Sequence, residues 1–471
     1  MNETERFYFA QDALLTTGWA RRVRVGVNDT GLITSLTCDV DPQHGDFVID
    51  GALLPGIPNL HSHSFQRGIA GRTTTRHLGS DNHFWTWREA MYHAALQRSP
   101  EEIEAIAAQC FLEMLSCGYT SVAEFHYLHK DHNGRPYHDL GELSHAVIRA
   151  ALRVGLPITH LPVLYRWSGV GAETPRDEQR RFILSLDEYA DLISGLDHHY
   201  NQHPLVKIGI APHSLRAVSS SDLDVLTSSP LYLSANGERR PFHIHIAEQT
   251  AEVDMWIEHT HQRPVEWLLD HYAVDEHWCL VHATHVNADE AKKMAQVGLT
   301  VGLCPSTEAD LGDGIFPLNE FLNAGGRYGI GSDSNLRCDP AEELRLLEWG
   351  QRLYHRQRNL SFSRAVPNLI DEERESLSQS LILAAVQGGS AALHRPTGIE
   401  VGRWADWFTL DKLDMGLSGA QGYLWGDQWV FAQRTSKVKT VFIAGEDVIT
   451  DGQHPLAHEI RTEFDKVMKR G

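Results

Sequence analysis

The chain has 471 residues, of which 42% are hydrophobic and 22% charged, a composition typical of a globular protein with one large domain or several average ones. Its formal net charge of -20 argues against nucleic acid and membranes as partners, because both require a basic patch. An anionic small substrate is still compatible with this charge, since a few arginines inside a pocket can reverse the local potential.

The cysteine usage and the start of the chain predict a cytoplasmic protein. The six cysteines form no CxxC pair, which indicates reduced thiols and neither a disulfide framework nor a cysteine zinc site. The opening MNETERFYFAQDALL lacks the basic and apolar regions of a secretion signal. No apolar run reaches the roughly 18 residues that a membrane-spanning helix needs.

Both ends of the chain are rich in short β-like runs. Residues 7–52 contain such runs separated by Gly, Asp and Asn turns, and residues 398–411 and 438–452 have the same texture. The last stretch includes AGED, a hairpin signal between two apolar runs. These flanks predict a small β-sandwich domain built from residues 1–52 and 398–471, the latter with a tail, around a body of residues 53–397.

In the body, strand-like runs alternate with helical patterns that often end in Gly. The eight strand candidates are 53–63, 120–127, 157–165, 206–214, 241–248, 277–285, 299–307 and 327–334. The helix candidates are 101–118, 142–155, 263–272, 288–298, 318–326, 342–359 and 375–393. This alternation predicts an α/β fold, a distorted (β/α)₈ TIM barrel with insertions. A doubly wound open sheet is the alternative, but no GxGxxG follows a first strand. The charged stretch 172–181 is expected to be a solvated loop.

Polar residues gather where these strands end, which is where barrel enzymes carry their active sites. His61 and His63 are two residues apart after an apolar run, so extended backbone points both imidazoles the same way. The fifth strand ends in HIHIAE, where His243 and His245 are equally plausible ligands and Glu248 begins a loop. The sixth strand ends with His282 and His285, and the eighth with Asp333.

A hydrolytic metal needs three or four nitrogen or oxygen ligands, an open position and a nearby base. His61, His63, one of the two histidines of the fifth strand and Asp333 would provide the ligands, with Glu248 as the base. Each residue alone has an ordinary structural explanation, such as helix capping by Asp333. Their joint position at the strand ends favours a metal site.

HSH, HxxE, a histidine after strand six and GSD after strand eight make the chain resemble the amidohydrolase superfamily, in its mononuclear deaminase branch. PHSLR stands where the binuclear branch carries a lysine. The resemblance therefore implies one divalent metal ion, most often Zn²⁺, with Fe²⁺ or Mn²⁺ as alternatives.

More narrowly, PNLHSHSFQRGIAG, FWTWREAMY, AEFHYLH, HSLRAV, HIHIAEQ, VHATH and STEADLGDGIFP together resemble the formimidoylglutamate deiminases. This resemblance implies hydrolysis of N-formimidoyl-L-glutamate to N-formyl-L-glutamate and ammonia in histidine degradation, by an enzyme that is commonly a homodimer. Asp310 stands where the family pattern has Asn.

The resemblance also assigns roles to individual residues. The implied metal ligands are His61, His63, His245 and Asp333. Glu248 is implied as the proton shuttle, and His282 as the residue that orients or polarises the substrate at its reacting carbon. Asp333 also helps to take the proton of the attacking water. The implied substrate-binding residues are Gln66, Arg88, Tyr127, His213 and Arg216. Of these, Arg88 and Arg216 suit the two substrate carboxylates, because a guanidinium meets a carboxylate in a two-bond fork. Arg88 is expected in an ordered, partly buried loop.

Two rival functions remain. Another deaminase of the same branch, acting on guanine or a related heterocycle, would stack a ring on aromatic side chains and would have less need for two arginines in the pocket. A metal-free barrel that serves as a binding module is expected to lack at least one of the metal-ligating residues, whereas all four are present in this sequence.

Overall fold

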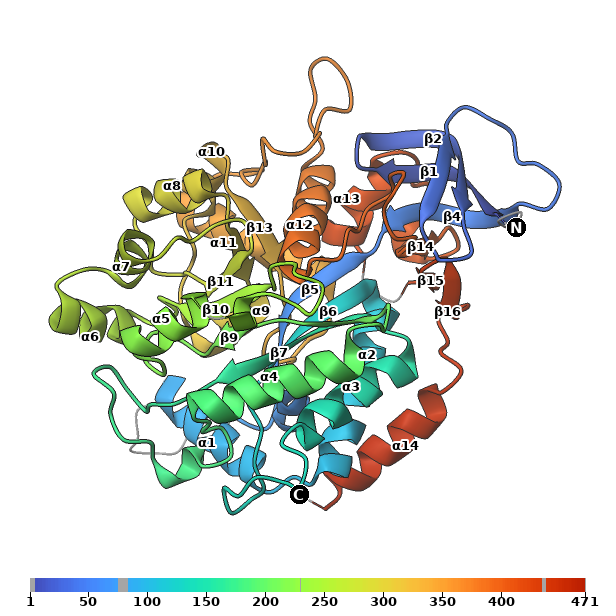
Figure 1. The fold of residues 1–471 in the computed structure, drawn as a ribbon. Coiled ribbons are helices and arrows are strands. Elements are labelled where there is room, and N and C mark those ends of the chain that lie inside the picture. The colour runs from blue at the N-terminus through green and yellow to red at the C-terminus, as the bar shows by residue number, and fades with distance from the viewer. Residues whose placement is uncertain (1–4, 75–83, 229, 434–437, 471) are drawn as a thin grey trace.

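The computed structural model describes residues 5–74, 84–228, 230–433 and 438–470. Its centre is a barrel of parallel strands, which confirms the predicted fold class (Figure 1). The barrel strands are β5 (Ile57–Ser62), β6 (Tyr119–His126), β7 (Ile158–Leu164), β8 (Val206–Ile208), β9 (Ala211–Pro212), β10 (Phe242–Ile246), β11 (Trp278–His282), β12 (Thr300–Leu303) and β13 (Arg327–Ile330). They form the parallel sheets β5-β6-β7-β8 and β10-β11-β12-β13, with β9 paired to β7. Bridges between Ser62 and Asp333 and between Ser214 and His245 join the two sheets.

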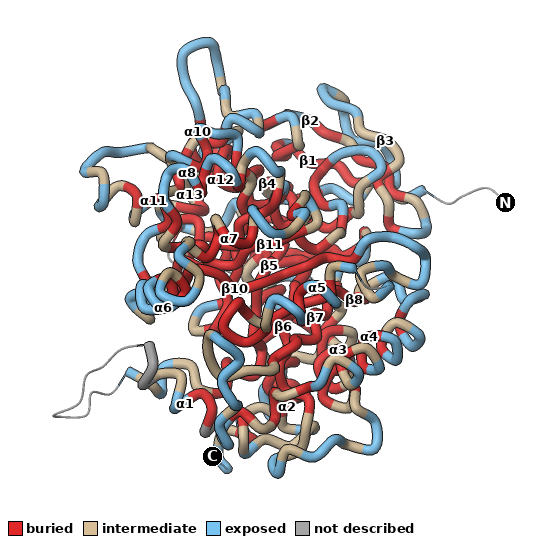
Figure 2. The backbone as a smooth tube through the Cα atoms, turned by 60° about the vertical axis from the view of Figure 1, so that its left-hand side comes forward, coloured by how far each residue is buried: buried red, intermediate tan, exposed pale blue. Residues whose placement is uncertain are grey.

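Helices surround the barrel, so the strands are covered on both sides. Every residue of β6, β7, β10 and β11 is buried, as expected for parallel strands under helices. The burial map shows the strands as the buried centre and the outer loops as the exposed rim (Figure 2). The helices are α1 (Phe84–Leu96), α2 (Pro100–Cys117), α3 (Glu142–Val154), α4 (Leu186–Tyr200), α5 (Ser220–Ser228), α6 (Thr250–Thr260), α7 (Pro264–His271), α8 (Ala288–Val297), α9 (Pro305–Leu311), α10 (Leu318–Asn323), α11 (Pro340–His355), α12 (Leu377–Leu393) and α13 (Leu424–Phe431). All seven predicted helices are among them.

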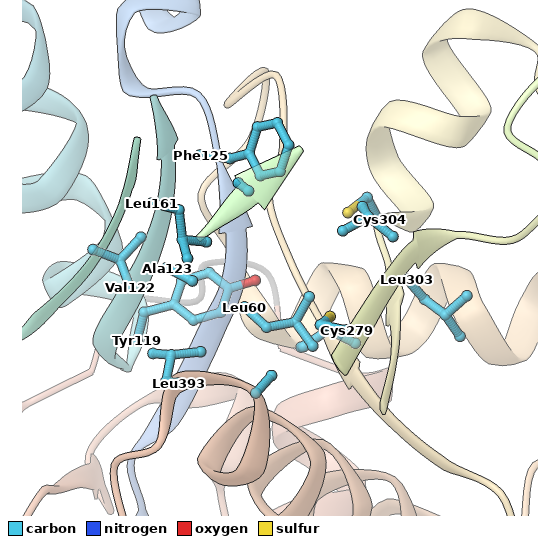
Figure 3. Packing of buried hydrophobic residues seen from close by; sticks show 14 of the residues in the cluster. Leu60, Tyr119, Val122, Ala123, Phe125, Leu161, Cys279, Leu303, Cys304 and Leu393 are labelled. Carbon is cyan, nitrogen blue, oxygen red and sulfur yellow. The ribbon is translucent and has the colours of Figure 1, made fainter. Parts of the chain in front are cut away.

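The barrel interior is filled by side chains. Leu60 of β5 and Cys279 of β11 meet there (Figure 3). Gly302 and Gly329 leave the space for Leu60, because a Cβ atom at these positions would lie 2.6 and 2.3 Å from its methyl groups. Helix α12 packs against β5 and β13. This apolar packing gives the strand ends a firm support.

The first predicted strand, 53–63, is in fact two strands. Residues Leu53–Pro55 end β4 (Phe47–Pro55), which pairs with β14 (Trp407–Asp411) outside the barrel. At Gly56 the backbone N–H donates to Asp406, and at Ile57 it donates to Gly118. The chain therefore passes from one sheet into the other at a single residue, which a continuous apolar run does not reveal.

Strands from both ends of the chain meet in one seven-stranded sheet, as predicted (Figure 1). Its order is β16-β15-β14-β4-β1-β2-β3, with β1 (Arg6–Leu15), β2 (Gly18–Val27), β3 (Ile33–Thr37), β15 (Thr440–Ile443) and β16 (Glu446–Ile449). The rings of Tyr8 and Phe442 lie 5.5 Å apart although β4 and β14 separate their strands, so the sheet curls over its own core. The division of the chain at residues 52 and 397 stays a prediction.

The predicted tail ends in helix α14 (Ala457–Met468), which packs on α2. Ile106 of α2 and Val467 of α14 share a small apolar cluster. Arg153 of α3 pairs with Glu459 and Glu463 at 2.7 and 2.6 Å. The last helix therefore ties the accessory sheet back to the barrel.

The expectation of a solvated loop at 172–181 is wrong at its end. Arg181 is fully buried and donates hydrogen bonds to the carbonyls of Ala95, Arg98 and Lys130. The guanidinium thus satisfies the free carbonyls at the end of α1, a role that charge alone does not indicate. Among the helices of the described ranges, none has both the length and the apolar character needed to cross a membrane.

Candidate active site

Three histidines and one aspartate converge at the C-terminal ends of the barrel strands. His61 Nε2 lies 2.9 Å from His245 Nε2 and 3.2 Å from His63 Nε2. Asp333 Oδ1 is 3.3 Å from His63 Nε2 and 3.6 Å from His61 Nε2. The four predicted ligands, distant in sequence, are therefore neighbours in space.

These separations fit a shared cation. Four ligand atoms about 2.0–2.1 Å from one tetrahedral ion lie roughly 3.3 Å from each other. Nitrogen and carboxylate oxygen donors are the set that catalytic zinc takes in hydrolases. The residues present therefore fit one divalent metal ion.

Hydrogen bonds fix the orientation of two of the histidines. Nδ1 of His63 donates to the Phe125 carbonyl at 2.7 Å, and Nδ1 of His245 donates to the His213 carbonyl at 3.0 Å. Each bond leaves Nε2 with a lone pair directed at the cluster. Burial keeps the pKa of His61 and His245 well below the ordinary value and lowers that of His63 to about 3. All three rings are therefore neutral near pH 7, as metal ligands must be.

His243 does not join this cluster. Its Nε2 donates to the Ala392 carbonyl of α12 at 2.9 Å. The side chain belongs to the contact between β10 and α12, away from His61.

Beside the cluster, His282 lies among three carboxylates. Its Nε2 is 3.7 Å from Glu248 and 3.6 Å from Asp333 Oδ2, and its Nδ1 is 3.3 Å from Glu308. Burial alone would lower the pKa of His282, but these carboxylates raise it to about 10. The ring therefore carries a positive charge near pH 7. Burial raises the pKa of Asp333 to about 7 in the absence of a bound cation.

The strand ends that carry this site adopt unusual backbone conformations. Ala247, His282 and Asp333 have φ values of +52°, +67° and +45°. Left-handed backbone at residues other than glycine costs of order 1–3 kcal/mol each and concentrates at functional sites. The surrounding hydrogen bonds of the barrel must hold these turns in place.

All five predicted substrate-binding residues line one narrow cavity of about 50 Å³, together with His63, His245, Glu248, His282 and Asp333. Gln66 Nε2 donates to the Tyr127 hydroxyl at 2.7 Å. Arg216 is only 6% exposed. Arg88 lies in helix α1, so the predicted loop is wrong, and its guanidinium lies 5.5 Å from the ring centre of Tyr92. The side chains of residues 84–86, part of the FWTWREAMY motif, lie outside the described residues.

The structure adds cavity residues that the sequence analysis did not name individually, although most of them lie in the motifs FWTWREAMY and STEADLGDGIFP. Trp87, Met91, Tyr92, Tyr165 and Leu311 also line the cavity. Tyr165 follows β7, so its place at a strand end was a usable signal. Asp310 is exposed and is absent from this lining, whereas its neighbour Leu311 contributes to it. Asp310, which departs from the family pattern, is therefore not part of the cavity lining.

A buried network of polar side chains holds the end of β5, which carries His61 and His63, in place. Glu124 of β6 accepts hydrogen bonds from the hydroxyls of Ser62 and Ser64 at 2.7 and 2.6 Å, and from the Ser64 N–H at 2.7 Å. Asn335 donates to Ser62 at 3.1 Å and to the Asp333 carbonyl at 3.0 Å. Ser62 and Ser64 thus fix the backbone on both sides of His63, which supports the position of this ligand.

A parallel barrel whose strand ends gather three histidines, an aspartate and a neighbouring glutamate has the architecture of a metal-assisted hydrolase. Comparison with known proteins agrees with this class. Residues 52–448 match the model described as "Amidohydrolase family", and residues 5–47 match "Formimidoylglutamate deiminase HutF, N-terminal domain". The chain belongs to the amidohydrolase family, whose members typically bind a metal ion.

Among curated proteins, the formimidoylglutamate deiminase of Pseudomonas aeruginosa is 44% identical over 451 residues, 95% of each chain. A 5-methylthioadenosine/S-adenosylhomocysteine deaminase of Natronomonas pharaonis is 26% identical over 91% of this chain and 88% of its own. Among solved structures, an amidohydrolase from Brucella melitensis superposes with a TM-score of 0.90, 41% identity and 99% coverage of both chains. A zinc-bound adenosine deaminase from Xanthomonas campestris, with a TM-score of 0.76, 20% identity and 98% coverage of both chains, shares the fold.

Proposed function

We propose that this protein hydrolyses N-formimidoyl-L-glutamate to N-formyl-L-glutamate and ammonia, a step of histidine degradation. The enzyme is a hydrolase that acts on carbon–nitrogen bonds, and its 44% identity to a curated formimidoylglutamate deiminase extends over 95% of the chain. The observation that carries the proposal is one cavity that is lined both by possible metal ligands and by two arginines, Arg88 and Arg216.

Two sets of side chains in this cavity suit the two halves of the substrate. The glutamyl half carries two carboxylates, and Arg88 and Arg216 supply positive charge inside a protein of net charge -20. The formimidoyl half must lie beside His63, His245 and Asp333. We assign Gln66, Tyr127 and His213 to the remaining polar atoms of the glutamyl half, because they line the same cavity.

Hydrolysis replaces the imino nitrogen with oxygen, so one water adds to the carbon and one ammonia leaves. A divalent ion, when bound, supplies the Lewis acidity that makes water a nucleophile at neutral pH. We assign Glu248 as the group that takes a proton from the water and delivers it to the departing nitrogen. Asp333 assists in accepting that proton, and the ring of His282 orients the reacting carbon. His282 lies within 3.7 Å of both carboxylates, so the three groups can act on one atom.

Zn²⁺ is our proposed metal, with Fe²⁺ or Mn²⁺ as alternatives. Its support is the cluster of His61, His63 and His245 together with Asp333, whose Oδ1 lies 3.3 Å from Nε2 of His63. A well-folded purified protein that contains none of these metals would instead favour a metal-free binding module.

The test is ammonia release from N-formimidoyl-L-glutamate by the wild type and by Arg216→Met, with guanine as the comparison substrate. Removal of one partner of a desolvated charge pair raises KM by at least about tenfold. Metal content should stay unchanged, because Arg216 is no ligand. Unchanged kinetics would remove the carboxylate role, and release from guanine alone would favour the heterocycle deaminase.

Cytoplasmic location and a homodimer complete the proposal. The six cysteines are free, as a reducing compartment requires. Light scattering tests the dimer, and a strictly monomeric mass would contradict it.

A further inference from the structure

Glu252 is a buried carboxylate that touches two parts of the site at once. It lies in the first turn of α6, four residues after Glu248, and is 2% exposed. Its Oε2 accepts a hydrogen bond from the Glu248 N–H at 3.2 Å. Its Oε1 lies 3.7 Å from Nε of Arg216, which lines the cavity.

A buried guanidinium is always charged and needs a counter-charge. Among the groups that act on Arg216, Glu252 and Glu248 are the carboxylates, and Glu252 has the stronger effect. If Glu252 lost its charge, Glu248 would be the acid left among the two carboxylates that raise the pKa of Arg216. A pair between Arg216 and Glu248 would turn the guanidinium away from the substrate.

We propose that Glu252 is a positioning residue that holds Arg216 toward the substrate carboxylate and keeps it apart from Glu248. The inference rests on the proposed function, since it concerns how that substrate is held. One carboxylate thereby sets both the arginine that binds the glutamyl half and the backbone of the proton shuttle.

The competing explanation is that Glu252 only caps α6, because a glutamate at the third helical position commonly accepts backbone N–H groups. Glu290 provides a matched control. It occupies the third position of α8, is also 2% exposed, accepts the Asn287 N–H at 2.9 Å and pairs with Arg263 at 2.7 Å. Neither Glu290 nor Arg263 lines the cavity.

The experiment compares Glu252→Gln with Glu290→Gln in the metal-loaded enzyme. Glutamine keeps an acceptor for the backbone N–H but removes the charge. Glu252→Gln should raise KM for N-formimidoyl-L-glutamate about tenfold with a smaller change in kcat, whereas Glu290→Gln should leave both within about twofold. Both variants should lower the melting temperature. If Glu252→Gln fails to fold, Glu252→Asp, which keeps the charge but shortens its reach, should raise KM in the same way.

A double-mutant cycle with Arg216→Met separates positioning from capping. If Glu252 acts through Arg216, Glu252→Gln should change KM by less than about twofold in the Arg216→Met background. Equal effects on KM in both backgrounds, or a Glu252→Gln enzyme with the kinetics of Glu290→Gln, would overturn the inference. A wild type that releases no ammonia from this substrate would instead overturn the proposed function.

Discussion

Depth along β10 decides which histidine can reach the metal. His243 and His245 are two residues apart, but His245 pairs its backbone with His213 at the strand end while His243 pairs with Ile210 below it. The His245 ring therefore meets His61, and the His243 ring meets the Ala392 carbonyl.

This difference predicts opposite metal contents for two matched variants. His245→Gln should lose at least about tenfold in metal affinity, because a neutral imidazole ligand is removed. His243→Gln should keep its metal and lose only stability, because its ring bonds to α12. Metal analysis of both purified proteins by mass spectrometry tests this, and metal loss in His243→Gln alone would reverse the ligand assignment.

Glu308 should matter for turnover although it lies outside the cavity lining. Its Oε1 accepts from His282 Nδ1 at 3.3 Å and from the Cys304 N–H at 2.9 Å, which turns His282 Nε2 toward Glu248. We expect Glu308→Gln to lower kcat by about 10–100-fold, as the loss of a carboxylate partner of an active-site histidine does. Steady-state ammonia release should show an unchanged KM. A kcat equal to that of Glu290→Gln would contradict this role.

For single residues, the sequence identified the site residues that lie in short motifs, but it did not identify the buried glutamates that hold them in position. His61 and His63 share one motif, and Glu248 follows His245 by three residues, so local spacing reveals them. Glu124, Glu252 and Glu308 act through residues 4 to 62 positions away or through backbone groups. Which of the many glutamates meets which strand end depends on packing, which spacing does not contain.

Among the elements, helix α12 makes a close backbone contact with β13 that the sequence of the helix does not predict. A Cβ atom at Gly388 would lie 1.8 Å from the Tyr328 carbonyl oxygen, so the helix and β13 touch through backbone. The exposed Gly195 of α4, by contrast, has no atom within 4 Å of such a Cβ.

Alanine at these two glycines should therefore have opposite effects on stability. Gly388→Ala should destabilise the protein by about 1–3 kcal/mol, because backbone must shift to admit the methyl group. Gly195→Ala should stabilise it by about 0.5–1 kcal/mol through higher helix propensity. Thermal unfolding of both variants measures the difference. Equal melting temperatures would mean that α12 can move away from β13 freely.

The elements themselves were largely predictable, because hydrophobic periodicity is local. The seven predicted helices and the eight predicted strands all overlap observed elements. The predicted strand 206–214 is divided into β8 and β9, the end of 299–307 is the start of α9, and helices such as α4 and α6 were not predicted. The break at Gly56 and the helical position of Arg88 were missed, since both depend on partners elsewhere, such as Asp406 and the cavity wall.

For the whole molecule, burial of histidine has a consequence for acid stability. His126, His129 and His160 lie side by side between strand ends and helices, with ring centres of His126 at 5.9 Å from His129 and 5.3 Å from His160. Burial lowers the pKa of all three, to about 4 for His129 and about 3 for His160, and far below the ordinary value for His126. They are neutral in the folded state at any pH above those values.

The unfolded chain protonates these histidines near pH 6.5, so below that pH it binds more protons than the folded state does. Stability should therefore fall as the pH drops from about 6.5 toward 4, by up to roughly 1.4 kcal/mol per pH unit for each histidine. His160→Gln removes one titrating group and should make the decline shallower by that amount, although the variant is less stable at pH 7. Urea unfolding of the metal-free protein from pH 7.5 to 4.5 avoids the contribution of metal release. Parallel curves for wild type and His160→Gln would show that His160 takes up its proton at the same pH in the folded protein as in the unfolded chain.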